Sequence, residues 1–272
     1  MHGVDAAASW GRIWAMTLRY LYLHRRGIVR NLSTGFWPVM DLLIWGYVTM
    51  YLRQMAIGIL GQAVLFMIGA VIFWDIHYRV QQGVTLSLME EIWTRNIINV
   101  LVSPLRMWEW MAATCLYSIF KVVSVTLVLG TLAQLLYAFR LTTIGWVAVP
   151  LAAQLLIFGW SVGIVTSGIL LRFGYAAETL IWAIPFLVQP FSAVFYPVSV
   201  LPVGAQWIAR CLPTSYVFEG LRMALREGTV TPGYLVAATG LNALYLLAAC
   251  VAFVAFFRSA QAAGRLSRLG QD

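Results

Sequence analysis

The chain of 272 residues is 61% apolar and only 10% charged, and its mean hydropathy is +0.82. These values lie far outside the range of soluble globular proteins and predict an all-α membrane protein. The net charge of +8 would suggest a nucleic-acid partner if the protein were soluble. Here, however, the arginines fall between apolar segments, as they do in the cytoplasmic loops of membrane proteins, so we expect no nucleic-acid partner.

The sequence offers no compact set of metal ligands. Its three cysteines lie far apart and two of them fall inside apolar segments, so neither a disulfide framework nor a metal knuckle is expected. The three histidines, His2, His24 and His77, are equally scattered. We therefore expect neither a catalytic centre nor a metal or other cofactor in this chain.

The first predicted element is an amphipathic helix over residues 8–26. Apolar residues recur at helical spacing from Trp10 to Leu21, whereas Arg12 and Arg19 point the other way. Such a helix is expected to lie along the membrane surface, with its arginines directed at anionic headgroups or at a partner protein. A plain lead-in helix without a partner is the alternative. Because no plausible cleavage site follows, we do not expect a removable signal peptide.

Six apolar segments follow that are long enough to span a membrane, since a spanning helix needs about 20 apolar residues. They cover approximately residues 35–52, 57–80, 111–137, 145–171, 175–194 and 234–257. With mostly short connections between them, these segments account for nearly the whole chain. We therefore expect a single membrane domain over residues 1–272.

The placement of the arginines predicts the orientation of these segments. An even number of spans puts both termini on one side, and with the termini inside, twelve arginines are cytoplasmic. Only five are then outside: Arg53, Arg140, Arg210, Arg222 and Arg226. We expect a multi-pass protein of the bacterial inner (cytoplasmic) membrane with both termini in the cytoplasm.

The cytoplasmic connection over residues 84–105 is predicted to contain a short amphipathic helix. The helix has an acidic start at Glu90-Glu91 and a stop at Ser103-Pro104. A membrane transporter that is driven by a separate motor needs a rigid element of this kind, which projects from its helices and can be pushed.

The acidic pair, followed by Thr94 and then by Leu101-Val-Ser-Pro-Leu105, resembles the coupling-helix region of ABC-2 permeases. Trp93 and Asn96 stand where that family more often has glycine and glutamate. The resemblance implies that an ATPase is contacted by Glu90, Glu91, Trp93, Thr94, Arg95, Asn96, Ser103 and Pro104, together with Arg12 and Arg19 of the N-terminal helix.

The second long connection, over residues 195–228, is apolar and rich in prolines. Pro197, Pro202 and Pro213 break it into helices that are too short to span a membrane. Non-helical backbone at membrane depth is tolerated only where protein or a water-filled cavity satisfies it. The stretch is therefore predicted to be re-entrant, with an ordinary exposed loop as the alternative.

The motifs of this connection are also similar to those of ABC-2 permeases. That family has an aromatic-Tyr-Pro turn after the fifth span, a Leu-Pro, a second proline before a Thr/Ser-Tyr pair, and an acidic-Gly/Ala-x-Arg ending, and the chain matches each in order. The resemblance implies an outer gate formed by Phe195, Tyr196, Pro197, Pro202, Pro213, Tyr216, Glu219 and Arg222.

The resemblance covers nearly the whole chain and implies the type-2 (type V) ABC exporter fold. Two permease copies, or this chain and a close homologue, would face each other around a central pathway. Each would contact a separate ATPase subunit that binds ATP and Mg²⁺. The sequence agrees that the motor lies elsewhere, because a P-loop needs a lysine and the only lysine, Lys121, falls near the middle of the third predicted span.

Charged and aromatic residues inside the predicted spans are candidates for the pathway of a hydrophobic, lipid-linked or glycan substrate, because charges are costly in lipid. They are Asp41, Trp45, Asp75, Lys121 and Trp160. Asp75 and Arg79 are spaced i, i+4, so a structural ion pair explains them at least as well as a substrate site. Two alternatives stay open: a non-transporting membrane partner of an ATPase, and a proton-coupled transporter that uses Asp41, Asp75, His77 and Lys121.

Overall fold

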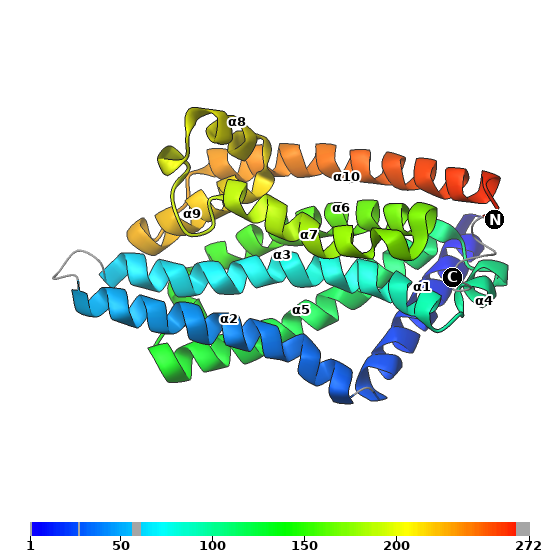
Figure 1. Cartoon of the computed structure of the whole chain (residues 1–272), viewed down its shortest axis with the longest axis horizontal. Coiled ribbons are helices and arrows are strands. Elements are labelled where there is room, and N and C mark those ends of the chain that lie inside the picture. The colour runs from blue at the N-terminus through cyan, green and yellow to red at the C-terminus, as the bar shows by residue number, and fades with distance from the viewer. Residues whose placement is uncertain (1, 27, 56–60, 265–272) are drawn as a thin grey trace.

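The structure, a computed structural model, describes residues 2–26, 28–55 and 61–264, and in these ranges every regular element is a helix (Figure 1). The long helices run roughly along the longest axis of the molecule: α2 (Ile28–Met55), α3 (Gly61–Trp93), α5 (Met107–Tyr137), α6 (Ala148–Phe173) and α10 (Pro232–Ala262). At one end, the α1 end, lie α1 (His2–Arg26) and α4 (Ile97–Val102). At the opposite end, the α9 end, lie α8 (Val203–Cys211) and α9 (Pro213–Glu227).

Three helical segments among the described residues are long and apolar enough to cross a membrane: Met107–Tyr137, Leu141–Phe173 and Pro232–Ala262. They contain the spans predicted at 111–137, 145–171 and 234–257. The expected all-α class is thus confirmed for the described residues, and their composition is compatible with a membrane protein. The predicted segment 35–52 lies within α2. Residues 57–60, where the second predicted span begins, and Arg265 and Arg268 lie outside the described residues.

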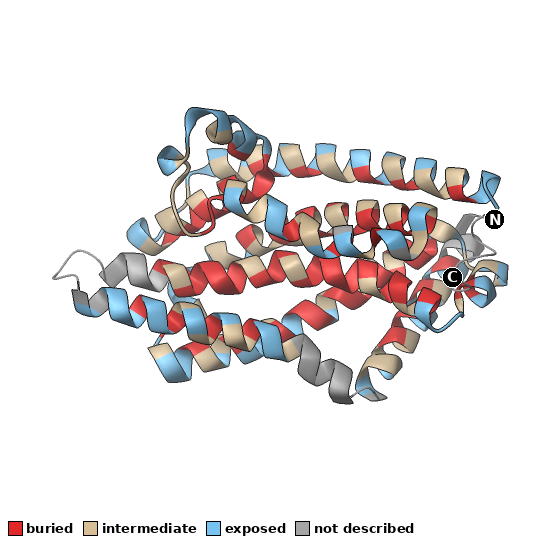
Figure 2. Cartoon of the chain, viewed as in Figure 1, coloured by how far each residue is buried: buried red, intermediate tan, exposed pale blue. Residues whose placement is uncertain are grey.

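The second predicted span belongs to a helix that is longer than expected, since α3 continues well beyond residue 80 to Trp93. Its polar stretch packs against protein. Thr85 Oγ1 donates a hydrogen bond to the Gln81 carbonyl oxygen at 3.0 Å and lies 2.6 Å from Thr166 Oγ1 of α6. Because these buried polar groups find partners within the protein, the helix continues past the end of the apolar run. Figure 2 shows α3 buried along most of its length.

The span predicted at 175–194 is broken in the structure. It consists of a 3-10 turn, η2 (Gly174–Ala177), then α7 (Glu178–Val188) and a second 3-10 turn, η3 (Gln189–Ser192). Pro185 lies inside α7, Pro190 follows it, and Ala193 adopts a left-handed backbone with φ of 54°. Prolines lack the N–H group that a continuous helix would use, so the α-helical part stays short.

Helix α6 approaches α3 closely at two glycines. A Cβ atom added at Gly159 would lie 2.8 Å from Val80 Cβ and 2.9 Å from the His77 carbonyl oxygen. One added at Gly163 would lie 2.8 Å from Val84 Cβ. Contacts this short require the helices to move apart. The small residues of α6 therefore allow it to pack closely against α3, as small residues of membrane helices commonly do.

We predict that Gly159→Ala destabilises the protein by about 1–3 kcal/mol, because the added methyl group overpacks the α3–α6 contact. The measurement is thermal unfolding of the purified protein in detergent. Gly240→Ala on α10 is the matched control, since a methyl group added there would have no atom within 4 Å. Because alanine favours helix, that control should be neutral or slightly stabilising. Equal melting temperatures for the two variants would contradict the close approach.

Candidate functional site

Two ion pairs fasten α1 across the ends of α3 and α5. Arg12 donates to both carboxylate oxygens of Glu109, at 2.9 and 2.5 Å, and Arg19 donates to both of Glu91, at 2.5 and 3.0 Å. The Glu109 and Glu91 side chains are only 0% and 1% exposed, whereas the two arginines are 29% and 37% exposed. A buried carboxylate is costly unless it is paired and hydrogen-bonded. Each arginine therefore compensates a charge that would otherwise be buried alone.

This arrangement differs from the expectation that Arg12 and Arg19 face headgroups or a partner protein. Both guanidinium groups face carboxylates of the same chain, whereas Trp10 and Trp14 of α1 are exposed. The buried carboxylates explain the difference, because an uncompensated buried charge would be very costly. Tyr20 also joins α1 to α5, since its hydroxyl accepts a hydrogen bond from the indole N–H of Trp110 at 2.8 Å. Burial raises the pKa of Tyr20 well above its ordinary value, so this hydroxyl stays neutral.

The end of α3 carries the acidic pair that was expected to begin a separate coupling helix. Thr94 Oγ1 donates to the Glu90 carbonyl oxygen at 2.8 Å. Asn96 donates to Glu91 twice, from its backbone N–H to the carbonyl oxygen at 2.8 Å and from Nδ2 to Oε2 at 2.6 Å. Arg95 adopts a left-handed backbone with φ of 55°, as the residue after a helix end often does. The predicted helix is therefore split, because these bonds terminate α3 before α4 begins.

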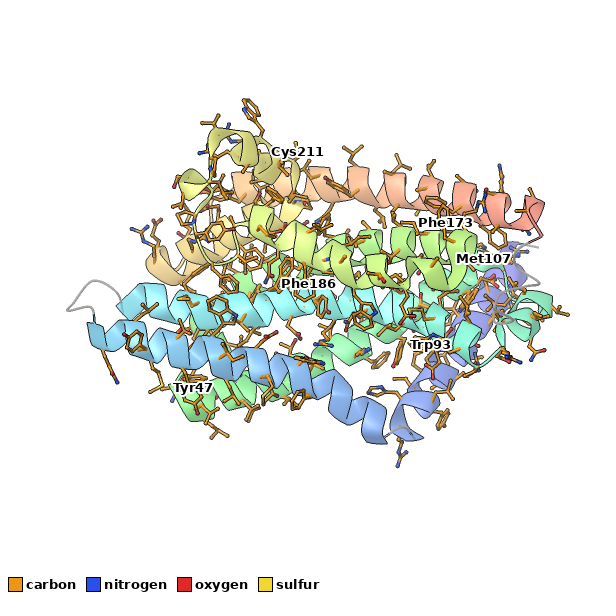
Figure 3. The ribbon with its side chains drawn as sticks, viewed as in Figure 1. Tyr47, Trp93, Met107, Phe173, Phe186 and Cys211 are labelled. Carbon is orange, nitrogen blue, oxygen red and sulfur yellow. The ribbon has the colours of Figure 1, made fainter. Side chains whose placement is uncertain are left out.

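Helix α4 has only six residues and presents apolar side chains at the α1 end of the molecule. Two residues of this helix, Ile97 and Val100, are buried, whereas Val102 is 81% exposed. Ser103 Oγ donates to the Val100 carbonyl oxygen at 2.6 Å and Pro104 follows, so the helix ends at the predicted stop. Other exposed apolar side chains here are Trp93, labelled in Figure 3, Ile98 and Trp108.

We predict that Arg12→Ala destabilises the protein by about 3 kcal/mol, because it leaves the buried Glu109 carboxylate without its cation. Arg25→Ala, which removes an exposed arginine from the same helix, is the control and should have little effect. Adding Glu109→Gln to Arg12→Ala should recover part of the loss, since it removes the uncompensated charge. Thermal unfolding in detergent measures all three, and a neutral Arg12→Ala variant would refute the role of the pair.

At the α9 end, one turn of α9 holds the chain segment that follows η3, which we call the 193–198 turn. Arg222 donates to the carbonyl oxygens of Ala193 and, at 2.6 Å, of Tyr196. Its guanidinium also pairs with Glu219 at 3.2 Å. Glu219 Oε1 accepts a hydrogen bond at 2.7 Å from the backbone N–H at the end of this turn. The two charged side chains therefore fix the turn at both of its ends.

The other residues predicted for an outer gate also act on the local backbone. Pro197 precedes the 3-10 turn η4 (Val198–Val200), Pro202 precedes α8, and Pro213 is the first residue of α9. The hydroxyl groups of Tyr196 and Tyr216 donate to backbone carbonyl oxygens at 2.6 and 3.0 Å. This region is thus a set of short helices held by side chain to backbone hydrogen bonds rather than an open loop.

We predict that Arg222→Lys loosens the 193–198 turn, because an ammonium group cannot reproduce the forked contacts of a guanidinium. Hydrogen exchange followed by mass spectrometry should show faster exchange of the amides in this turn. Arg226→Lys, one turn further along α9 on an exposed side chain, is the control. Identical exchange in both variants and the wild type would contradict the clamp.

Three cavities follow one another along a single face of α3, and together we call them the α3 groove. Their volumes are about 240, 550 and 370 Å³, and their lining includes Asp75, Arg79 and Glu90, respectively. Tyr78 lines both the first and the second cavity, and Leu86 lines both the second and the third. From the first charge to the last, the groove follows α3 for about 22 Å. That distance is most of the roughly 30 Å thickness of a hydrocarbon core.

Helices α2, α5 and α7 supply the other walls of the α3 groove. Asp41 and Trp45 come from α2, Lys121 from α5, and Trp182 and Phe186 from α7. Figure 3 labels Phe186 on α7, beside α3. The structure therefore brings together four of the five residues predicted for a pathway: Asp41, Trp45, Asp75 and Lys121.

Two further residues singled out in the sequence lie in the core instead. Trp160 Nε1 donates to Ser118 Oγ at 2.9 Å, so this ring joins α6 to α5 and is not part of the groove lining described above. His77 is fully buried, and its ring centroid lies 5.0 Å from that of Phe158 and 5.1 Å from that of Trp74. Neither side chain is among those that line the three cavities.

Sequence reasoning missed Glu109 and the wall that α7 contributes. Glu109 accepts a hydrogen bond from the Arg106 backbone N–H at 2.8 Å, and an acidic residue in the first turn of a helix was the available signal. Trp182 and Phe186 are spaced i, i+4, so their shared face was visible in the sequence. Nothing in the sequence shows which helix that face meets.

A scan of the chain against protein-family models finds no match, and a search of curated proteins finds no match either. The α3 groove, with α4 at one end and the 193–198 turn at the other, is the candidate functional site.

Proposed function

We propose that this chain is the membrane permease subunit of an ATP-driven ABC-2 exporter and that a separate ATPase subunit binds ATP and Mg²⁺. In this proposal the chain has six spans in the bacterial inner membrane, both termini lie in the cytoplasm, and two copies face each other. The observation that carries the proposal is α4, a short helix with exposed apolar side chains that is joined directly to the helix lining the whole groove.

The connection between α4 and α3 supports a coupling role. Glu91, at the end of α3, binds both Arg19 of α1 and Asn96, the residue before α4. A force applied to α4 or α1 would therefore be transmitted to α3 through these bonds and would not be lost in a flexible connection. Since α3 is the wall common to all three cavities, such a force would act on the groove, which is what a motor-driven transporter requires.

The exposed surface at the α1 end supports a protein partner. Ile98 and Val102 of α4 are exposed, and so is Trp93 at the end of α3. Clusters of aliphatic and aromatic side chains commonly form the centre of protein interfaces. In this proposal the cluster docks onto the ATPase, and the exposed Arg95 and Asn99 lie at its rim.

A contact at the α9 end supports a gate that closes the groove at the end opposite to α4. Phe195, in the 193–198 turn, stacks on Trp45 of the groove wall with ring centroids 4.2 Å apart. Short helices with this attachment suit a gate for a hydrophobic, lipid-linked or glycan substrate. A proton relay has less support, because His77 is enclosed between aromatic rings and Asp75 is already paired with Arg79 at 3.0 Å.

We predict that Val102→Glu prevents co-purification of the ATPase and abolishes ATP-dependent export, because it places a charge in the centre of the proposed interface. The fold should be unaffected, since Val102 is exposed on α4. Val203→Glu, on the exposed surface of α8 at the opposite end, is the matched control and should retain the ATPase. If the tagged wild-type chain brings down no ATPase, or if Val102→Glu retains it, the coupling role is refuted.

A further inference from the structure

The first cavity of the α3 groove combines two carboxylates with a dense set of aromatic rings. Its acidic side chains are Asp41 and Asp75. The rings that line it are Trp45, Trp74, Tyr78, Phe186 and Phe195. Aromatic faces attract organic cations, and cages of such rings bind quaternary ammonium groups. The lining of this cavity therefore has the chemistry that recognises an ammonium group.

The rings of this cavity are held in place by one another. Trp45 stacks on Phe195, and the ring centroids of Tyr78 and Phe186 lie 6.0 Å apart. Trp74 contacts Phe218 of α9 with a centroid distance of 6.4 Å. A ligand that enters finds the walls already formed and does not have to order them, which favours binding.

One carboxylate of this cavity is exposed, and the other has an acceptor atom that no hydrogen bond within the described ranges uses. Asp75 Oδ1 accepts a hydrogen bond from Arg79 at 3.0 Å, as the i, i+4 spacing predicts. Asp75 Oδ2 is buried and has no hydrogen-bond partner among the residues that the structure describes. Asp41 is exposed and lines both this cavity and the next one. An ammonium group placed here would meet one negative charge and one unused acceptor atom.

The second cavity adds positive charge beside the first. It has a volume of about 550 Å³, within the usual range of ligand pockets, and is lined by Arg79, Gln82 and Lys121 as well as by Asp41. The charges of the two cavities therefore balance, with two carboxylates facing two cations. A ligand with a net charge would leave one charge uncompensated in a low-dielectric site. A ligand that carries both signs a few atoms apart would leave none.

We propose that these two cavities bind the zwitterionic headgroup of an amphipathic molecule. The ammonium group lies among the rings beside Asp41, and a phosphate lies toward Arg79 and Lys121. Arg79 has N–H donors beyond the two that it gives to Asp75 and Gln82. The apolar tail lies along the rest of the groove. This inference rests on the proposed function, because it names the substrate class of the path assigned there.

Binding to the purified full-length chain in a maltoside detergent tests the proposal without the ATPase. Isothermal titration, corrected with protein-free micelles, compares three ligands with the same dodecyl tail: dodecylphosphocholine, dodecylphosphoglycerol and dodecyltrimethylammonium. The zwitterion should bind about tenfold more tightly than either singly charged ligand. Glycerophosphocholine, a soluble zwitterion with the same phosphodiester headgroup charge and no apolar tail, should bind more weakly than dodecylphosphocholine.

Asp41→Asn should weaken binding of dodecylphosphocholine about tenfold and should not weaken that of dodecylphosphoglycerol, whose single negative charge the variant site then balances. Asp41→Glu should retain most of the binding. The control is Glu227→Gln, which removes an exposed carboxylate at the end of α9. Trp45→Leu is a second test of the same site, because it removes one ring and no charge, and it should also weaken the zwitterion selectively.

Equal affinity for the three dodecyl ligands, or unchanged binding of the zwitterion to Asp41→Asn and Trp45→Leu, would overturn the proposal. Glycerophosphocholine that binds as tightly as dodecylphosphocholine would overturn the amphipathic part of it. The outcome is separable from that of the proposed function. A chain that binds the zwitterion but captures no ATPase would keep the site and lose the exporter, and the reverse result would keep the exporter and lose this substrate class.

Discussion

Charge that is buried must be compensated, and this constraint shapes the molecule from one end to the other. At the α1 end, the carboxylates of Glu91 and Glu109 are removed from solvent, and the arginines of α1 reach across to them. In the middle of α3, Asp75 and Arg79 pair within one turn of helix. At the α9 end, the charged side chains of α9 hold the 193–198 turn. The contacts at the two ends also join elements that lie far apart in the sequence.

Helix α3 has a different role on each of its sides. One side meets α6 so closely that glycine is required at Gly159 and Gly163, and buried hydroxyl groups bridge the two helices. The other side lines the three cavities of the groove. A helix that packs tightly against a neighbour on one side and lines cavities on the other can act as a rigid wall.

Much of the fold could be predicted from the sequence because it depends on local pattern. Composition indicated an all-α protein, as the described residues are, and three of the six predicted spans lie in helices that are long and apolar enough to cross a membrane. Prolines correctly indicated short helices after residue 195. The length of α3 could not be predicted in this way. Its polar half is stabilised by contacts such as that of Thr85 with Thr166, which are remote in the sequence.

The residues of the candidate site, like the fold, could be predicted from the sequence only in part. Isolated charges in apolar segments pointed to Asp41, Asp75 and Lys121, because such charges are rare in lipid, and the structure brings them to one groove. The partner of Arg12 could not be predicted, since Glu109 lies 97 residues away and no local pattern relates the two. The same limit applies to Trp160, whose spacing does not reveal which of its neighbours it faces.

The stacking of Phe195 on Trp45 makes one ring of the groove wall part of the 193–198 turn. Any displacement of that turn would withdraw Phe195 and leave Trp45 without its support. In the proposed exporter, opening at the α9 end and loosening a substrate in the first cavity would therefore be the same physical event. In that proposal, a substrate bound there would lose part of its binding site as the gate opened, so that no separate release step would be needed.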